Sequence, residues 1–432
     1  MARTRRRSNG WLAGLPPVAW YRRVLRPHPV GRWTLPFVLF SLFIAYPFYY
    51  RSIGTLVDLD TVVVMAVYVM LALGLNIVVG YAGLLDLGYV AFFALGAYSI
   101  GWFASDRFNG VTFHFGSVAP DGLPGIHLNF WLVVLIAGAI AGIAGVIIGW
   151  PTLRLRGDYL AIVTLGFGEI VPDVFRNADQ LRVPSGLAVS GDPPFLGLPP
   201  FLAYENTFNL TDGVRGIRQL DRPGFGGDIG SATGGTLPER YGSIELKPWF
   251  YTIVVMCLIT IFVNYRLRDS KMGRAWIAVR EDEVAASAMG VPLMRTKLWA
   301  YGIGAVFGGF AGAFYGSFIG SVFPTSFFFN ISIIILCMII VGGMGNIYGV
   351  ILGALVLQYL NLEGLDKIGK GLNDFIHSLG IDATVEVPKY KFLIFGVLLV
   401  TMMLFRPEGF IPSARRKAEF QEAKEEAQEA VV

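Results

Sequence analysis

The chain has 432 residues, of which 54% are hydrophobic and only 15% charged, with a net charge of +4 and a mean hydropathy of +0.57. A soluble domain carries roughly a quarter of its residues as charged ones. A chain so poor in charge cannot cover the surface of a soluble protein, whereas a bilayer removes that requirement. The composition therefore excludes an ordinary soluble domain and predicts an integral membrane protein.

The residue types that most often bind metals or form disulfides, cysteine and histidine, are few and scattered in this chain. The two cysteines, Cys257 and Cys337, both lie inside apolar runs, which favours a role in packing over a disulfide or a ligand. The four histidines fall outside the apolar runs and form no HxxxH or HxxEH pattern: His28, His114, His127 and His377. The sequence predicts no metal site and no cofactor.

A nucleotide site is not expected either. The nearest match to a P-loop is residues 364–371, GLDKIGKG, which lacks the final Ser or Thr hydroxyl that would hold magnesium. No strand is expected before it. If ATP is used, another polypeptide must bind it.

The first 34 residues hold eight arginines and no acidic residue. A signal peptide would place its apolar segment earlier, within the first ~30 residues. We interpret residues 1–34 as a basic cytoplasmic tail, and nucleic-acid binding by Arg3–Arg7 is the alternative.

Ten apolar runs approach the ~20 residues that a spanning helix needs. They predict an all-α polytopic bundle of about ten membrane segments: Leu35–Tyr50, Val62–Gly80, Gly83–Ala104, Leu128–Trp150, Asp158–Phe175, Trp249–Tyr265, Leu298–Ile319, Phe328–Val341, Ile347–Leu360 and Tyr390–Phe405. Residues 35–175 form the first transmembrane half and residues 249–412 the second.

The distribution of basic residues predicts the orientation. With the N-terminus in the cytoplasm and sides alternating across ten spans, 22 of the 35 Lys and Arg residues fall on the cytoplasmic side. Cytoplasmic short loops carry an excess of Lys and Arg. Both termini are therefore expected inside, including the charged tail 413–432, and the Gly- and Pro-rich loop 176–248 is expected outside. The expected location is the plasma (inner) membrane, crossed many times.

The segment Ser270–Val291 differs from the spans around it. Apolar Trp276, Ile277, Val284, Ala288 and Met289 recur at near-helical spacing, and charged residues cluster between them. This pattern predicts an amphipathic cytoplasmic helix that docks into a partner, and a solvated surface helix is the alternative. The candidate coupling residues are Gly273, Trp276, Arg280, Glu281, Asp282, Glu283, Ala285, Ala286, Met289 and Gly290.

Glycines recur every four positions at Gly304, Gly308, Gly312, Gly316 and Gly320, and a second series comprises Gly138, Gly142, Gly145 and Gly149. Such stripes are typical of helices that pack closely in a membrane. Lining of a narrow pathway is the alternative.

Two carboxylates, Asp86 and Glu169, lie within apolar runs, where an ionisable group is by default a functional hypothesis. In the structural alternative, Asp86 lies near the cytoplasmic N-terminal end of its helix, and Glu169 is held by backbone or hydroxyl donors, such as Thr164. Two Gly-rich interruptions, 79–83 and 341–345, resemble the broken helices of transporters. The candidate pathway residues are Gly80, Gly83, Asp86, Glu169, Gly342, Gly343 and Gly345.

Five segments resemble one known family, the permeases of branched-chain amino-acid ABC transporters, LivM-like branch. They are Gly74–Tyr98 (GLNIVVGYAGLLDLGYVAFFALGAY), Leu153–Ile170 (LRLRGDYLAIVTLGFGEI), Gly273–Glu283 (GRAWIAVREDE), Val341–Gly345 (VGGMG) and Leu404–Gly409 (LFRPEG). The similarity covers roughly residues 62–178 and 249–412. The Arg-rich N-terminus and much of 181–248 depart from the family's pattern.

The resemblance implies the permease subunit of an ATP-driven importer, which binds no nucleotide itself, so this chain alone is not expected to be an enzyme. Its expected partners are a second homologous permease, two cytoplasmic ATPases and an extracytoplasmic substrate-binding protein, and 270–291 is then the coupling helix. The substrate is expected to be a branched-chain or related small amino acid, and relatives that carry urea or short amides give the alternative. An ion-coupled secondary transporter and a membrane assembly protein are the alternatives from other classes.

Overall fold

The computed structural model describes residues 41, 43–50, 57–108, 112–116, 123–155, 157–179, 181–182, 207–224, 240–242, 245–378, 385–406 and 408–411. The predicted tails 1–34 and 413–432 and most of the loop 176–248 lie outside these residues. The chain forms two compact units, Met1–Leu59 and Asp60–Val432. In the first unit, the Tyr46 hydroxyl of the short helix α3 (Tyr46–Tyr49) donates a hydrogen bond to the Val57 carbonyl at 2.5 Å.

The second unit is mainly helical. Its helices are α4 (Leu59–Leu75, continued by the π-helical turn η3, Asn76–Tyr81), α5 (Val90–Phe103), α6 (Phe130–Thr152), α7 (Asp158–Asn177), α9 (Lys247–Asp269), α10 (Lys271–Glu281), α11 (Glu283–Ala288), α12 (Leu293–Ile319), α13 (Asn330–Gly342), α14 (Ile347–Tyr359, continued by π-helical η8, Leu360–Gly364), α15 (Leu365–Ser378) and α16 (Lys391–Phe405). Short 3₁₀ turns are η6 (Gly213–Arg215), η7 (Pro324–Phe327) and η9 (Val387–Tyr390).

Seven helices of the described chain are long and apolar enough to cross a membrane: Leu59–Tyr81, Phe130–Thr152, Lys247–Asp269, Leu293–Ile319, Pro324–Gly342, Ile347–Ser378 and Val387–Phe405. Each matches a predicted span. Three predicted spans have no counterpart among these seven helices. The span Asp158–Phe175 is helical, as α7, but too polar to be counted with the seven. The span Leu35–Tyr50 lies partly outside the described residues, and Gly83–Ala104 is only partly helical. A polytopic helical membrane protein is confirmed, and the count of ten stays a prediction.

The predicted span Gly83–Ala104 is wrong in its first third. Helix α5 begins at Val90, and its 14 residues rise only about 21 Å, less than the ~30 Å hydrocarbon core. The chain before it, residues 82–89, is irregular. Gly83 has φ +70°, which L side chains rarely adopt, and Asp86 and Gly88 follow within five residues. These residues interrupt the helix.

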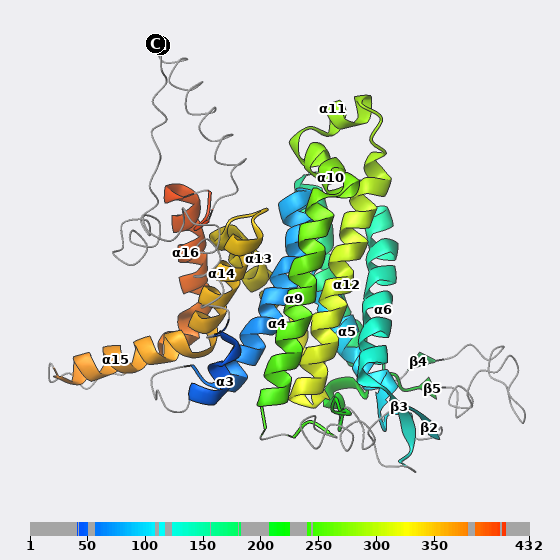
Figure 1. Ribbon diagram of the computed structural model, residues 1–432, viewed down its shortest axis with the longest axis vertical. Coiled ribbons are helices and arrows are strands. Elements are labelled where there is room, and N and C mark those ends of the chain that lie inside the picture. The colour runs from blue at the N-terminus through cyan, green and yellow to red at the C-terminus, as the bar shows by residue number, and fades with distance from the viewer. Residues whose placement is uncertain are drawn as a thin grey trace, which may run out of the picture. The chain divides into compact units, whose positions relative to one another are not determined.

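The helices α4, α5, α6, α9 and α12 run side by side (Figure 1). Helices α10 and α11 lie at one end of this bundle, and strands β2 (Thr112–Phe115) and β3 (Gly125–Leu128) lie at the other. The predicted coupling segment and the loops predicted outside therefore occupy opposite ends of the bundle. Which end faces the cytoplasm stays a prediction.

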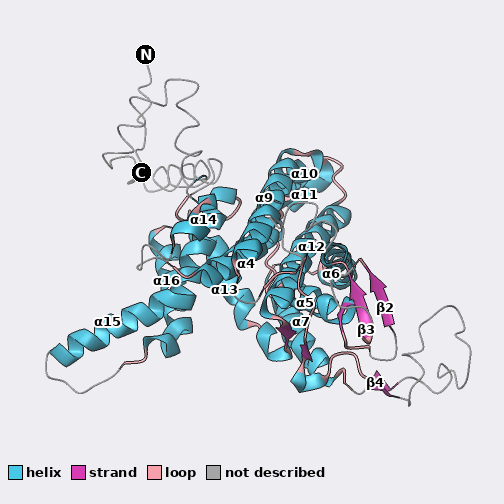
Figure 2. Ribbon diagram, turned by 60° about the horizontal axis from the view of Figure 1, so that its bottom comes forward, coloured by secondary structure: helices cyan, strands magenta, loops and turns pink. Residues whose placement is uncertain are grey.

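The strands are short and lie outside the spans (Figure 2). Strand β3 pairs antiparallel with β1 (Ala104–Ser105) and parallel with β2. Two further two-residue pairs are antiparallel: β4 (Leu181–Arg182) with β5 (Thr207–Phe208), and β6 (Ile217–Arg218) with β7 (Ser321–Val322). The all-α prediction holds for the membrane part and missed these small sheets.

Helix α12 lies between α5 and α6, and its glycines set the close approach to α5. A Cβ at Gly312 would clash with the Phe93 carbonyl, and one at Gly308 would lie 3.0 Å from Phe92 Cβ. The second stripe packs α6 against α12, where a Cβ at Gly145 would lie 2.7 Å from Ala305 Cβ. The packing interpretation of both stripes is confirmed. Gly320 is the exception, because it ends α12 with φ +75° and has open space around it.

We expect Gly312→Ala to destabilise the protein by about 1–3 kcal/mol, because the added methyl group meets backbone that cannot rotate away. The measurement is the unfolding temperature of the detergent-purified protein. Gly396→Ala is the matched control, since Gly396 lies in the apolar helix α16 and a Cβ added there would meet nothing within 4 Å. Equal unfolding temperatures for the two variants would contradict the packing argument.

Orientation can be tested with two exposed residues at opposite ends of the bundle. Phe113 in β2 is 51% exposed, Met289 is 85% exposed, and both native cysteines are buried. In intact cells, we expect a membrane-impermeant thiol reagent to label Phe113→Cys, and to label Met289→Cys only after permeabilisation. The reverse pattern would overturn the orientation deduced from the basic residues.

Candidate functional site

The irregular chain between α4 and α5 is the centre of the candidate site. In a bilayer, an irregular backbone is tolerated only where protein groups or water satisfy its polar atoms. Here four side chains bond the backbone of the break and its two ends. Arg280 of α10 donates to the Gly80 carbonyl, and Thr164 Oγ1 of α7 accepts the Leu87 N–H at 3.0 Å. Asp86 Oδ1 accepts the Gly88 N–H at 2.9 Å, and Ser332 Oγ of α13 accepts the Val90 N–H at 3.0 Å. The break is therefore fixed by α7, α10 and α13.

The π-helical turn η3 also contacts the Gly-rich turn between α13 and α14. The Asn76 side chain is fully buried, and its Oδ1 accepts the N–H of Gly345 at 2.9 Å. A Cβ at Gly80 would clash with Asn76 Oδ1 and lie 2.8 Å from the Gly345 nitrogen. Gly80 and Gly345, from the two predicted Gly-rich interruptions, thus meet directly. π-Helical turns are frequently found at functional sites.

Arg280 joins these elements to the predicted coupling segment. Besides its bond to the Gly80 carbonyl, its side chain packs on Gly83, where a Cβ would lie 2.6 Å from Arg280 Cγ. A Cβ at Gly345 would lie 3.5 Å from Arg280 Nη1. Four predicted site residues from two separate lists, Gly80, Gly83, Arg280 and Gly345, therefore form one cluster.

The coupling segment was predicted as one helix, and this is wrong: it is two. Ser270 Oγ caps α10 by accepting the Gly273 N–H at 3.1 Å. Asp282 then takes an extended conformation, and its carboxylate caps α11 by accepting the N–H groups of Val284 (2.7 Å) and Ala285 (3.0 Å). An Asp that satisfies free N–H groups favours a new helix start over the interior of a continuing helix.

One face of this helix pair holds it to the bundle. Trp276 is fully buried, and its indole N–H donates to the Thr296 carbonyl at 2.8 Å. Ala286 is also buried. Glu283 pairs with Lys297 at 2.6 Å, and Lys297 is only 6% exposed. Trp276, Ala286 and Glu283 thus make contacts within the chain, although the sequence interpretation counted them toward a partner's groove.

The opposite face is open. Val284 is 69% exposed, Met289 is 85% exposed, and Ala285 lies between them at the surface. Glu281 and Asp282 are exposed beside them, and Gly290, with φ +84°, ends the segment. This surface, which we call the α11 face, combines small and apolar side chains with acidic ones.

The two intramembrane carboxylates have different surroundings. Asp86 is buried in the irregular segment four residues before α5, where its Oδ1 accepts the Gly88 N–H; it does not cap the helix, whose N-cap residue is Tyr89. Glu169 lies on the exposed side of α7. Thr164 bonds the Leu87 N–H, so the described structure gives no support to Thr164 as the partner of Glu169. Asp86 is thus buried and Glu169 exposed.

The turn at 342–346 is fixed by the end of the described chain. The Phe410 and Ile411 N–H groups donate to the carbonyls of Val341 (2.8 Å) and Gly342 (3.1 Å). Gly343 has φ +116°, and a Cβ there would lie 2.6 Å from the Ile411 carbonyl oxygen. Glycine is therefore required at position 343, where the turn meets the backbone of Ile411. Gly345 is the glycine of this turn that contacts η3.

Sequence reasoning missed Asn76 and Ser332 and gave Thr164 the wrong partner. The available signal was a polar residue inside an apolar run, which in lipid must find a hydrogen bond. That signal identifies the residue but not its partner, since Val90 and Ser332 are 242 positions apart in the sequence.

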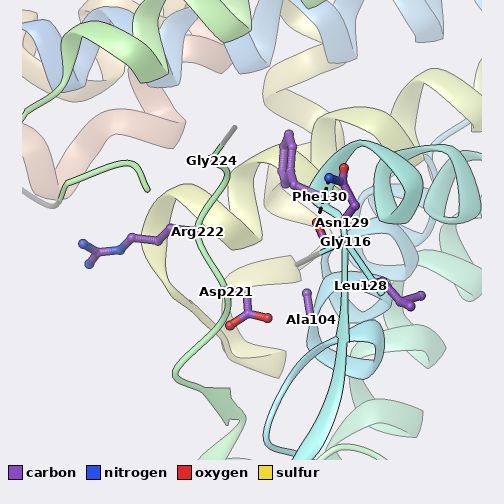
Figure 3. Close-up of a pocket in the computed structure, with 8 residues that line it drawn as sticks. All are labelled: Ala104, Gly116, Leu128, Asn129, Phe130, Asp221, Arg222 and Gly224. Carbon is purple, nitrogen blue, oxygen red and sulfur yellow. Dashed lines mark hydrogen bonds between the residues drawn. The ribbon is translucent and has the colours of Figure 1, made fainter. Parts of the chain in front are cut away.

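The opposite end of the bundle holds polar loops without a metal centre in the described residues. His127 Nδ1 lies 2.6 Å from Asp221 Oδ2, which joins β3 to the segment after β6. Figure 3 shows the adjacent cavity, into which the Asp221 carboxylate faces and beside which Asn129 bonds the Gly116 carbonyl. Its volume is about 10 Å³, enough for one water molecule at most. We infer a structural role for it.

Comparison with known proteins decides the family. The sequence profile of the family described as the branched-chain amino acid transport system permease component matches residues 59–403. The chain belongs to this family. It is 35% identical over 380 residues to the high-affinity branched-chain amino acid transport system permease protein LivM of Escherichia coli K12, covering 87% of this chain and 74% of that one.

Two further relatives of this permease extend the comparison. The probable LivM of Methanocaldococcus jannaschii is 24% identical over 377 residues, 82% of this chain and 94% of the relative. The permease protein LivH of Escherichia coli K12 is 24% identical over 349 residues, 80% of this chain and 91% of the relative. No solved structure matches the chain significantly.

The five segments that resemble this permease family are brought together by the fold. Gly74–Tyr98 contains η3 and the break, Leu153–Ile170 supplies Thr164, and Gly273–Glu283 supplies Arg280. Val341–Gly345 supplies the turn that reaches Asn76, and the chain just after Leu404–Gly409 bonds that turn. The segments that resemble the family are therefore those that form the helix break or supply groups that bond the break and the turn beside it.

We expect Thr164→Val to destabilise the permease by about 1–3 kcal/mol, because it leaves the Leu87 N–H without its acceptor in a dry environment. Thr164→Ser keeps the hydroxyl and is the control. The measurement is thermal unfolding of the two purified variants beside the wild type. If Val and Ser variants unfold together, the hydroxyl does not support the break.

Proposed function

We propose that this chain is the permease subunit of an ATP-driven importer for branched-chain or related small amino acids in the cytoplasmic membrane. It works with a second, homologous permease, two cytoplasmic ATPases and a substrate-binding protein outside. Membership of the permease family and the LivM and LivH relatives support this proposal. The observation that carries it is the link from α10 through Arg280 to the helix break.

In this proposal, the α11 face is where an ATPase docks. Small residues permit close approach, and the apolar Val284 and Met289 provide buried area on binding. Acidic Glu281 and Asp282 at the rim select the partner and its register more than they add affinity. Trp276, Ala286 and the Glu283–Lys297 ion pair make the helix pair move as one body with the end of α12.

Movement of that body then reaches the pathway by a short route. Arg280 is bonded to the Gly80 carbonyl, and Gly80 contacts both Asn76 and Gly345. A shift of α10 must therefore move η3 or break its contacts, and η3 is bonded to the turn between α13 and α14. The chain's own role is mechanical: it changes the shape of the break while ATP is hydrolysed in the separate ATPases.

The substrate is the finer part of the proposal. The apolar, Gly-rich lining does not select leucine, isoleucine or valine, and binding of urea or a short amide is the alternative. The test is competition for uptake in proteoliposomes that contain all subunits, with branched-chain amino acids, urea and short amides as competitors. Competition by branched-chain amino acids alone supports the proposal, and competition by urea or amides alone supports the alternative.

An ion-coupled secondary transporter is the candidate from another class. Such a protein transports without ATPases and responds to an ion gradient. We expect uptake to require both ATPases and ATP and to persist when ionophores collapse the ion gradients. Uptake by the permeases alone would contradict the ATP-driven proposal.

Ala285→Trp tests the docking surface, because Ala285 is exposed and its replacement leaves the packing of the chain intact. We expect the permeases to assemble normally, the co-purified ATPase to fall at least tenfold, and ATP-driven uptake to fall with it. Ala286→Trp is less informative, since Ala286 is buried inside the chain.

The matched control is Phe115→Trp, which enlarges an exposed residue at the opposite end of the bundle. It is expected to retain the ATPases. Wild-type ATPase retention and uptake in the Ala285→Trp complex would show that the α11 face is not the docking surface.

A further inference from the structure

Helix α14, the turn η8 and helix α15 form one continuous helix that is too long to lie within the hydrocarbon core. It contains 32 residues, Ile347–Ser378, and at a rise of about 1.5 Å per residue it is about 48 Å long. The core is ~30 Å thick. The 13 residues of α14 and the 5 of η8 together reach about 27 Å, which is nearly enough to cross it. Helix α15 therefore begins near the surface of the bilayer.

Helix α15 does not continue in the direction of the spans. In Figure 1 it runs crosswise to α16 and away from the bundle, and in Figure 2 it also extends away from the other helices. The opposite end of α14 begins at the turn whose Gly345 lies beside Arg280 of α10. Helix α15 thus follows the end of α14 that is remote from α10. On the predicted orientation, this is the outer surface of the membrane.

The surface of α15 has three sectors of different chemistry, and the first packs against the chain that leads into α16. A Cβ at Gly369 would lie 3.4 Å from Val387 Cβ. The Asn373 side chain accepts the Val385 N–H at 2.8 Å and donates to the Val385 carbonyl at 3.2 Å. These contacts hold one side of α15 against the segment before α16.

The second sector is apolar and exposed. Ile368, Leu372 and Phe375 follow one another at spacings of four and three residues, so they lie on one face of the helix. They are 53%, 39% and 61% exposed. A continuous exposed apolar stripe marks a surface that binds protein or membrane. We call these three residues the α15 stripe.

The third sector is charged. Asp366, Lys367, Lys370 and Asp374 are all exposed. At about 100° per residue, their centre lies roughly 150° around the helix from the centre of the α15 stripe. A helix with an apolar face and an opposite charged face, and with low net hydrophobicity, is typical of the interface between lipid and water.

The segment that precedes α16 places α15 beside lipid. Between Phe392 and Phe405, the exposed residues of α16 carry no charge, as a lipid-facing span requires. Tyr390, just before α16, is 57% exposed, and tyrosine is enriched at membrane–water interfaces. Helix α15 packs against η9, the turn that ends at Tyr390. The headgroups that surround the start of α16 are therefore close to α15.

The residues that resemble a P-loop, 364–371, belong to this helix. Gly364 ends η8, and the rest lie in α15, so no loop is present that could surround a phosphate. Gly369 packs against Val387, and Lys367 pairs with Glu363 at 2.7 Å. The glycine and lysine of this motif thus have contacts within the chain that do not involve a nucleotide.

We propose that α15 is a lipid-binding helix that lies in the surface of the bilayer, with the α15 stripe among the acyl chains and the charged sector in the headgroups and water. The two acidic and two basic residues of that sector balance, so burial of apolar area supplies the binding and anionic lipid is not required. This inference requires only that the chain spans a membrane, and it does not depend on the proposed transport function.

Another subunit is the competing occupant of the α15 stripe. Lipid is favoured because α15 begins where a span reaches the bilayer surface and packs against the first turn before a lipid-facing span. The charged sector supports the same choice, since it provides the water-facing side that an interfacial helix needs.

The first test measures contact with lipid in nanodiscs of zwitterionic phospholipid, for the full chain and for the complete complex. Leu372→Cys and Asp374→Cys each receive a fluorescent thiol label, and the unsubstituted protein, whose Cys257 and Cys337 are buried, gives the background. We expect a quencher on the lipid acyl chains near the headgroups to quench the label at position 372 at least threefold more strongly. Aqueous iodide should show the reverse preference, for position 374.

Three results would overturn the inference. Equal lipid quenching at the two positions would mean that the α15 stripe is not in lipid. A label at position 372 that is protected from both quenchers in the complete complex would place the stripe against another subunit. Lipid quenching that appears only after anionic lipid is added would mean that charge, and not the apolar stripe, provides the binding.

The second test changes the stripe itself. Phe375→Glu puts a charge among the acyl chains, so it should lower lipid quenching of the Leu372→Cys label at least threefold, and the milder Ile368→Ser should lower it in the same direction. Lys370→Glu is the matched control in the charged sector and should leave the quenching unchanged. Thermal unfolding of each variant shows whether the fold is retained. Unchanged quenching in both stripe variants would show that the stripe does not hold α15 to lipid.

Discussion

A break in a membrane helix leaves backbone donors and acceptors that no water molecule of the hydrocarbon core can satisfy. Between α4 and α5, this chain meets the requirement with side chains of α7, α10 and α13, each contributing one hydrogen bond. Each bond fixes one helix relative to the break. The positions of these three helices relative to the break therefore depend in part on a few polar atoms.

Close packing of α5 against α12 brings a further pair of polar groups within hydrogen-bonding distance. A hydrogen bond requires its heavy atoms within about 3 Å, so the backbones of α5 and α12 must approach far more closely than two leucine-lined helices would allow. Glycines in α12 permit this, and the Tyr89 hydroxyl then donates to the Gly304 carbonyl at 2.9 Å. The glycine stripe of α12 thus lies against the residue that precedes α5, at the end of the helix break.

The apolar helices could be predicted from the sequence, because the length of an apolar run depends only on neighbouring residues and can be compared with the thickness of a bilayer. It also identified Gly80, Gly83, Arg280 and Gly345, but as members of separate motifs, because their meeting depends on contacts across about 200 positions. The amphipathic pattern of 270–291 was visible, yet it could not say which face turns inward. Trp276 and Ala286 were expected at a partner and are buried in the chain, because an apolar face satisfies either surface equally well.

Helices α7 and α10 are both bonded to the short stretch of chain around the break. Arg280 holds the Gly80 carbonyl from one side, and Thr164 holds the Leu87 N–H from another. Packed protein interiors shift between discrete arrangements more readily than they deform continuously. A displacement of α10 therefore either breaks the Arg280 bond or carries η3 with it. Because α7 is bonded to the same short segment through Thr164, a displacement of that segment likewise either breaks this bond or carries α7 with it.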